Sequence, residues 1–196
     1  MLHIIDDEET IRDSLTWLAR SRSIAATPHA GASAFIAALD EMEGFDSAGD
    51  CLLLDIRMPG MSGIALFDTL HARGLTERLP VIFLTGHGDV PMAVDTLKRG
   101  AFDFFEKPFN DNNLMDRVQQ ALAASLDAGA SAQVQARLAA LSTREREVLD
   151  LILEGKMNKV VADMLGISMR TVEVHRAHIF DKMNVKTAVE LARLLK

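Results

Sequence analysis

The sequence predicts an α/β domain built on a five-stranded parallel sheet, followed by a small all-α domain. Over about the first 120 residues, short apolar runs and helix-period segments alternate five times. Such alternation is typical of a doubly wound parallel sheet with helices on both faces. From Ser142 onward the apolar spacing is purely helical. A chain of 196 residues is long enough for two small domains.

The expected strands are short apolar runs, because a strand buried on both faces shows no polar alternation. They cover residues 2–5, 24–26, 51–54, 81–84 and 103–105. The helix-period stretches between them lie near residues 10–20, 33–39, 64–72, 90–98 and 112–123.

A joint rich in Ala, Ser and Gln follows, with no large aromatic residue. We interpret residues 125–138 as a linker, in part helical, and we expect its break at Asp127-Ala128-Gly129. The expected domains are therefore residues 1–124 and 139–196, on either side of this linker.

Helix-start and helix-stop residues divide the second half into four helices. Ser142 and Glu145 form a capping box at the start of the first, which Gly155 ends. Asn158 is the expected cap of a short second helix that stops at Gly166, and Ser168 that of a third reaching about residue 183. A fourth covers residues 188–195. A short helix, a tight turn and a longer helix give the spacing of a helix-turn-helix.

The net charge of −7 is divided unevenly along the chain. Residues 1–125 carry 19 acidic and 10 basic side chains, a net of −9, whereas residues 126–196 carry 9 and 11, a net of +2. Within residues 155–196 there are 8 basic and 4 acidic side chains, a net of +4. Only the second half has the sign expected of a surface that meets nucleic-acid phosphates.

The composition favours a globular protein of the cytoplasm. Hydrophobic residues make up 48% of the chain and charged residues 25%. The single cysteine, Cys51, cannot form an internal disulfide and is interpreted as a small buried hydrophobe. No apolar run approaches the roughly 20 residues that cross a bilayer, and the N-terminus shows no signal-peptide pattern, so no membrane partner is expected.

Polar residues follow the expected strands in an order that brings them to one edge of the sheet. Asp6 and Asp7 follow the first strand, Asp55 the third, Thr85 the fourth and Lys107 the fifth. Three close carboxylates repel one another unless a cation holds them, and Mg²⁺ prefers such oxygen ligands. A carboxylate can attack phosphorus to form an acyl phosphate, and Asp55 on a central strand is best placed to do so. A cis Lys107-Pro108 bond would fix where the ammonium points.

Four segments of the first half are similar to the signatures of response-regulator receiver domains: IIDDEE, LLLDIRMPGMSG, TGHGDVPMAV and DFFEKPF. The resemblance covers residues 1–123 and implies a flavodoxin-like fold. It implies that a cognate sensor histidine kinase phosphorylates Asp55, and that Asp6, Asp7, Asp55 and the backbone carbonyl of Arg57 hold Mg²⁺. Thr85 and Lys107 would engage the phosphoryl oxygens, and Phe104 would act as a rotamer switch. The face formed by residues 90–99 and 103–105 would support a homodimer on phosphorylation.

The second half resembles the LuxR-type helix-turn-helix in LSTREREVL, NKVVADMLGIS and RTVEVHRAHIFDKM. Together with the first half it is closest to the FixJ-like branch of the LuxR/NarL class. The resemblance implies binding to double-stranded promoter DNA, with RNA polymerase as a further partner. Many LuxR-type proteins have lysine where Glu173 stands, which affects the operator sequence.

A helical wheel orients the third helix independently of any resemblance. Val172, Ile179 and Met183 share one face, which should pack inward with His175 and Arg176 at its edges. The opposite face carries the expected base readers Arg170, Glu173, Val174 and Ala177. The candidate phosphate contacts are Asn158, Lys159, Thr171, His175, Arg176, Lys182 and Lys186. The alternatives are a core role for His175, an internal ion pair for Arg176, and plain solvation for Lys182 and Lys186.

Two other functions use the same residues. A phosphorylation-independent DNA-binding regulator would not need the intact acidic set. An aspartate-based phosphatase needs a second acid for the leaving group, but the second residue after Asp55 is Arg57, so we expect a regulator and not an enzyme.

Overall fold

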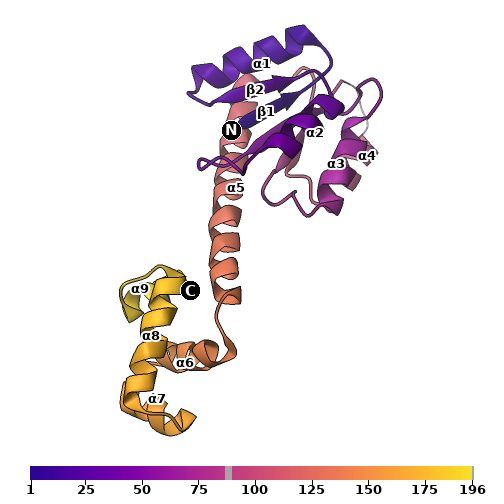
Figure 1. Ribbon diagram of the computed structural model, residues 1–196. Coiled ribbons are helices and arrows are strands. Elements are labelled where there is room, and N and C mark those ends of the chain that lie inside the picture. The colour runs from indigo at the N-terminus through magenta and orange to yellow at the C-terminus, as the bar shows by residue number, and fades with distance from the viewer. Residues whose placement is uncertain (87–89, 196) are drawn as a thin grey trace. The chain divides into compact units, whose positions relative to one another are not determined.

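The computed structural model describes residues 1–86 and 90–195, and the chain forms two compact units, Met1–Gly129 and Ala130–Lys196 (Figure 1). The middle of the segment TGHGDVPMAV, at residues 87–89, lies outside the described residues. Within the described ranges we find no helical stretch that could span a bilayer.

The first unit contains a five-stranded sheet of parallel strands in the order β2-β1-β3-β4-β5. The strands are β1 (Leu2–Ile5), β2 (Ala26–His29), β3 (Cys51–Asp55), β4 (Val81–Thr85) and β5 (Asp103–Glu106). This is the predicted fold class, and β1, β3 and β4 are buried along their whole length. All five carboxyl ends therefore meet at one edge.

The prediction for the second strand was wrong by about two residues. Ile24 ends the preceding helix instead: its N–H donates to the Ala19 carbonyl at 3.0 Å, and Ser23 adopts a φ of 58°. This is the pattern of a Schellman C-cap, in which an apolar residue after the turn packs back onto the helix. The burial of Ile24 thus belongs to a helix end, and β2 begins only at Ala26.

Helices cover both faces of the sheet (Figure 1). They are α1 (Glu9–Ser21), α2 (Ala32–Glu41), α3 (Gly63–Ala72), α4 (Val90–Lys98) and α5 (Asp111–Ala139). One core cluster joins the sheet to α2 and α3 through Phe35 and Phe67, and the other joins it to α1 and α5 through Leu15 and Val118.

Polar groups form a buried chain near the amino ends of β1 and β3. His3 lies 3.2 Å from His29 and 3.3 Å from Asp50, and the Asp50 N–H donates to the Ser125 hydroxyl of α5 at 2.9 Å. Burial, with repulsion from His3, lowers the pKa of His29 to about 4. The network ties α5 to the sheet.

Helix α5 passes through the whole of the expected linker. The predicted break at Asp127-Ala128-Gly129 is wrong, because α5 continues without interruption to Ala139. A glycine inside a helix costs only about 1 kcal/mol relative to alanine, and the Ala-rich neighbours favour the helix. Gly129 has a packing role: a Cβ at this position would overlap the guanidinium of Arg78. The boundary between the two compact units also falls directly after Gly129.

The second unit contains α6 (Thr143–Leu153), α7 (Asn158–Leu165), α8 (Met169–Met183) and α9 (Ala188–Leu194). The capping box of Ser142 and Glu145 is confirmed, and so are the Ser168 cap and the left-handed Gly166. Asn158 is not a cap: it is the first residue of α7, and the cap position is Met157, which makes no side-chain bond. The core of this unit gathers around Val148, Val161 and Ile179.

Candidate functional site

A lysine and two carboxylates meet at the carboxyl edge of the sheet. The Lys107 ammonium, just after β5, donates to Asp55 Oδ1 at 2.8 Å and to Asp6 Oδ2 at 2.9 Å. Asp55 is the last residue of β3, and Asp6 directly follows β1. Both carboxylates are buried, with Asp6 1% and Asp55 7% exposed. These three residues converge as the strand order predicts. The Lys107-Pro108 peptide bond is cis.

The charges at this edge perturb one another. Burial, with repulsion from Asp6, raises the pKa of Asp55 above its ordinary value against the opposing pull of Lys107. Burial by itself would lower the pKa of Lys107, but the hydrogen bonds to Asp55 and Asp6 outweigh it and raise the pKa. The lysine therefore stays charged and compensates the two buried acids.

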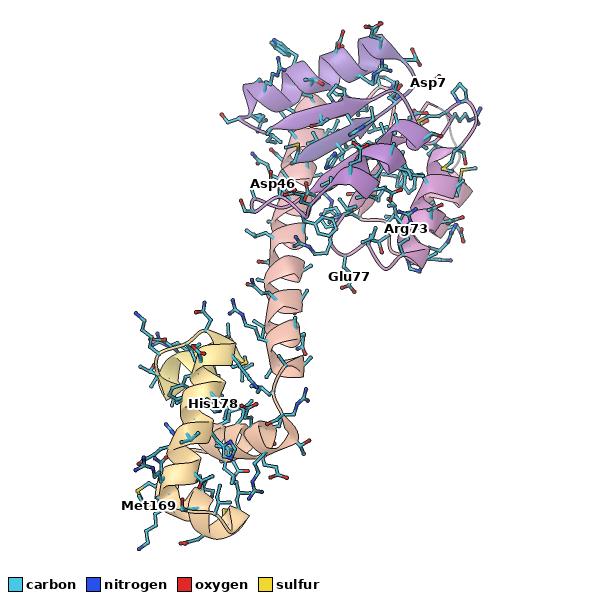
Figure 2. The ribbon with its side chains drawn as sticks, in the orientation of Figure 1. Asp7, Asp46, Arg73, Glu77, Met169 and His178 are labelled. Atoms are coloured by element: carbon cyan, nitrogen blue, oxygen red, sulfur yellow. The ribbon has the colours of Figure 1, made fainter. Side chains whose placement is uncertain are left out.

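Asp7 does not join the buried pair. Its side chain is exposed at the outer edge of the unit (Figure 2), and within residues 1–86 and 90–195 no group of three His, Cys, Asp or Glu side chains could hold a metal. The expected nest of three carboxylates is thus reduced to two buried ones. Two carboxylate oxygen donors still fit Mg²⁺, which is usually bound by one or two carboxylates with waters and a phosphate.

The loop after β3 holds Asp55 in place. The backbone N–H of Arg57 donates to Asp55 Oδ2 at 2.7 Å, and the N–H of Gly63 donates to the Ile56 carbonyl at 3.0 Å. A Cβ on Gly63 would lie 2.1 Å from the Asp55 carbonyl oxygen, so only glycine permits this approach. Gly60 turns the same loop at a φ of 76°. Glycine is common in turns, so the sequence alone does not distinguish Gly63 from an ordinary turn residue.

Thr85 and Phe104, the expected switch residues, lie on the neighbouring strands β4 and β5. Thr85 ends β4 one residue after Leu84, which pairs with Asp55 of β3. It is 4% exposed, and its carbonyl accepts from the Lys107 N–H at 2.7 Å. Phe104 pairs with Phe83 across β4 and β5 and packs, partly buried, against the core of α2 and α3.

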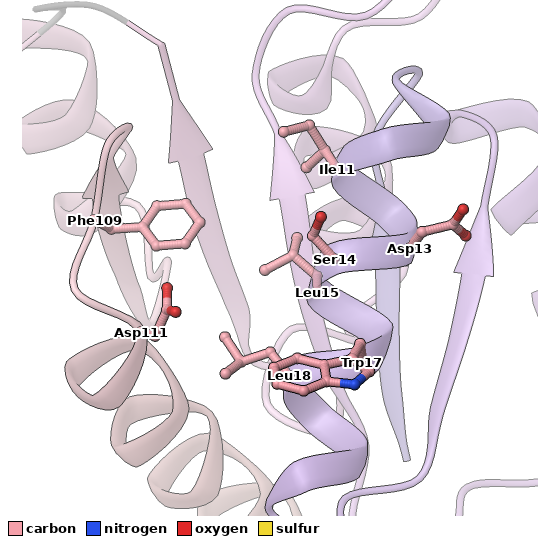
Figure 3. A pocket seen from close by; sticks show the side chains of 8 residues that line it. All are labelled: Ile11, Asp13, Ser14, Leu15, Trp17, Leu18, Phe109 and Asp111. Carbon is pink, nitrogen blue, oxygen red and sulfur yellow. The ribbon is translucent and has the colours of Figure 1, made fainter.

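A pocket that the sequence did not predict lies between α1 and the residues that follow Lys107 (Figure 3). One wall is α1, with Ile11, Leu15 and Leu18, and the facing wall includes Phe109, two residues after Lys107. Trp17 lines the same pocket and is 72% exposed. A single exposed tryptophan gives no periodic pattern from which a pocket could be predicted. The facing wall of the pocket, with Phe109, comes from a distant part of the chain.

Helix α8 presents the two faces that the helical wheel predicts. Val172, Ile179 and Met183 are fully buried in the core of the second unit. The expected base readers Arg170, Glu173, Val174 and Ala177 are all exposed. Figure 2 labels Met169 and His178 on this helix. The orientation of α8 toward its own core is therefore confirmed.

The candidate phosphate contacts differ in their surroundings. Lys159 and Lys186 are exposed, and Asn158 and Thr171 are half-buried, with the Thr171 hydroxyl 2.8 Å from that of Ser168. His175 is half-buried, and its Nδ1 is buried with no hydrogen-bond partner within the described residues. Arg176 stacks on the Phe180 ring at 5.3 Å to the centroid.

Lys182 forms an ion pair within the second unit. Its ammonium donates to Glu145 at 2.7 Å and to the Ala140 carbonyl at 3.2 Å. Glu145 is a buried acid whose charge this ammonium compensates, while the Lys182 side chain itself is 39% exposed and stays a candidate phosphate contact.

Family models match both halves of the chain. The model of the response regulator receiver domain matches residues 2–119, and that of bacterial regulatory proteins of the luxR family matches residues 139–195. The chain belongs to the response regulators that carry a luxR-type DNA-binding domain.

Relatives match the chain over nearly its whole length. The C4-dicarboxylate transport transcriptional regulatory protein DctR of Rhodobacter capsulatus is 52% identical, and the match covers 98% of this chain and 98% of DctR. The transcriptional regulatory protein FixJ of Azorhizobium caulinodans is 44% identical, with 98% and 90% covered. Among solved structures, the response regulator StyR is similar with a TM-score of 0.71 at 36% identity, over 99% of this chain and 96% of that one. Full-length FixJ of B. japonicum has a TM-score of 0.58 at 40% identity, with 98% and 94% covered.

Proposed function

We propose that this regulator accepts a phosphoryl group on Asp55 from a sensor histidine kinase, and that the modified chain binds promoter DNA through α8. One observation carries the proposal: Lys107 Nζ lies within 2.9 Å of both Asp55 and Asp6. An ammonium shared by two buried carboxylates is placed to receive the charge of a phosphoryl group.

The chemistry is a displacement at phosphorus. A carboxylate oxygen of Asp55 attacks the phosphorus, an O–P bond forms, and the bond from phosphorus to the histidine nitrogen of the kinase breaks, so that the imidazole takes the leaving electron pair. Asp6 and Asp55, with the Arg57 carbonyl as a further oxygen donor, would hold Mg²⁺, and Asp7 would join them by turning inward from its exposed position. The ion would neutralise charge on the transferring oxygens. Lys107 provides the second cation, and the fixed loop of Gly63 keeps Asp55 in line.

The pocket of α1 is proposed as the docking site of the kinase. Ile11 and Phe109 on its walls are close in sequence to Asp6 and Lys107, and Arg12 of α1 donates to the Asp6 carbonyl at 2.9 Å. A protein that transfers a phosphoryl group to Asp55 must bind the surface near this residue. The exposed Trp17 offers it a large apolar contact there.

The readout is proposed to be a dimer on DNA in the cytoplasm, with RNA polymerase as the next partner. The phosphoryl group adds charge beside Thr85, which would move toward it and let Phe104 turn inward. Val94 and Leu97 of α4 are exposed apolar residues on the face expected to pair two chains. Two copies of α8 would then read half-sites about 34 Å apart.

Base contacts are assigned to the exposed face of α8. Arg170 would donate to guanine, Glu173 would accept from a cytosine amino group, and Val174 would pack on a thymine methyl. Lys159 at the start of α7 is the leading phosphate contact because it is exposed. Asn158, Thr171, His175 and Arg176 remain candidates, and Ala177 allows close approach to the bases.

Intact-mass measurement tests the acceptor. The purified chain is incubated with acetyl phosphate and Mg²⁺, and a single phosphoryl adduct is expected that Asp55→Asn abolishes. An adduct of equal yield in Asp55→Asn would refute the assignment of Asp55, and the absence of any adduct on wild type would refute the proposal of phosphorylation.

A further inference from the structure

The first turn of α6 contacts both helices of the helix-turn-helix. Arg144 donates to the carbonyl of Leu165, the last residue of α7. Its neighbour Glu145 accepts from Lys182 near the end of α8 at 2.7 Å. His178, one turn earlier on α8, lies 3.8 Å from the other oxygen of the same carboxylate. The first turn of α6 therefore holds both α7 and α8 through side-chain contacts.

Glu145 is itself fixed. Its side chain is 5% exposed, and it accepts from the Ser142 N–H at 2.8 Å as part of the capping box. Charge-assisted hydrogen bonds are short, directional and stronger than neutral ones. A carboxylate held on one side by the backbone thus fixes the position of the ammonium on its other side.

The end of α8 is also tied to the end of α5. Arg137, in the last turn of α5, donates to the carbonyl of Met183 at 3.2 Å, and Lys182 donates to the Ala140 carbonyl at 3.2 Å. Met183 is the last residue of α8, where backbone carbonyls lack helical partners and the helix dipole favours a cation. Side chains from α5, α6 and α8 meet at the junction between α5 and α6.

The geometry points to a positioning role for this set, which we name the α8 clamp: Arg137, Glu145 and Lys182. We propose, resting on the DNA-binding role of α8 given above, that the clamp sets the orientation of α8 and that DNA affinity therefore depends on the α5–α6 junction. Successive residues of a helix are about 100° apart around its axis, so a modest rotation of α8 would turn Arg170 and Glu173 away from base edges. Lys182 then acts through α8 and touches no phosphate.

Salt dependence separates a positioning residue from a phosphate contact. The full chain, treated with acetyl phosphate and Mg²⁺, is titrated with a duplex that it selects from a random-sequence library, over a series of salt concentrations. Lys182→Gln is expected to weaken binding about tenfold, with the slope of log affinity against log salt unchanged. Binding to an unselected duplex should stay the same. The matched control Lys159→Gln should lower the magnitude of the slope by about 0.9.

Two further variants exclude a general loss of stability. Val148→Ala removes buried core atoms outside the clamp and should leave the affinity per folded molecule at the wild-type value. Arg137→Gln should weaken binding as Lys182→Gln does, and Lys182→Arg should restore most of the affinity. If Lys182→Gln does not fold, Arg137→Gln and Lys182→Arg carry the test.

Three results would overturn the clamp: a slope reduced by Lys182→Gln as by Lys159→Gln, wild-type affinity per folded molecule in Lys182→Gln, or wild-type affinity in Arg137→Gln. Failure of the underlying function gives a different result. If wild type selects no duplex, or if Arg170→Ala binds the selected duplex as tightly as wild type, α8 is not the reading helix, whatever the clamp variants do.

Discussion

The ammonium of Lys107 lies 2.8 Å from Asp55, although 52 positions separate the two residues in the chain. The first prediction follows from this pair. Lys107→Met removes the cation and leaves two buried carboxylates uncompensated, which raises the pKa of Asp55 further. Phosphorylation by acetyl phosphate, followed by intact mass, should slow about tenfold or more because the transferring oxygens lose a positive partner. A rate within about twofold of wild type would show that Lys107 does not assist phosphorylation of Asp55.

The close approach of Gly63 to Asp55 gives the second prediction. Gly63→Ala would place a Cβ 2.1 Å from the Asp55 carbonyl, so the loop must shift. Urea unfolding should show a loss of about 1–3 kcal/mol, and phosphorylation should slow because Asp55 moves with the loop. Gly44→Ala is the matched control, since a Cβ there meets nothing within 4 Å. Equal effects at both glycines would contradict the packing argument.

Trp17 distinguishes docking of the kinase from chemistry at Asp55. Trp17→Ala should lower the rate of transfer from the kinase about tenfold, because a large apolar contact is lost. The rate from acetyl phosphate should not change, since the small donor needs no docking surface. Val189→Ala, an exposed apolar residue on α9, is the control and should alter neither rate. A fall in both rates for Trp17→Ala would place Trp17 in the acceptor site itself.

Glu145 makes the stability of the second unit depend on acidity. Hydrogen bonds from Lys182 and from the Ser142 backbone lower the pKa of Glu145 from 4.5 to about 2. Because the folded pKa is the lower one, the stabilisation is complete above pH 4.5 and is lost as the pH falls toward about 2.

The difference in urea midpoint between wild type and Glu145→Gln, followed by far-UV circular dichroism, should therefore shrink over that range. The amide of the variant does not titrate, so other acidic groups affect both proteins alike. A difference that stays constant down to the lowest pH would show that Glu145 is not held in its ionised form.

Strand order and helix periodicity were enough to predict the sheet and the meeting of Asp6, Asp55 and Lys107, because parallel strands bring their carboxyl ends to one edge. The inward face of α8 followed from spacing alone. The errors arose where a local pattern had two physical causes. Ile24 is apolar because it caps a helix, and Gly129 accommodates Arg78 without breaking α5.

The side-chain partners of Lys182 could not be predicted from local sequence. A lysine on the exposed flank of a basic helix has the same pattern whether it faces phosphate or a buried acid. Only the fold brings Glu145, 37 positions earlier, to the same place. The exposure of Asp7 likewise could not be predicted from local sequence. Its neighbour Asp6 is buried at the edge of the sheet, whereas Asp7 is exposed.

The most direct test of the account is the affinity of the full-length chain for a selected promoter duplex, measured with and without acetyl phosphate and Mg²⁺. Wild type should bind about tenfold or more tightly after treatment, as expected when the paired chain engages two half-sites, and Asp55→Asn should show no change. Equal affinity of wild type before and after treatment, with Asp55 fully phosphorylated, would contradict phosphorylation-gated DNA binding.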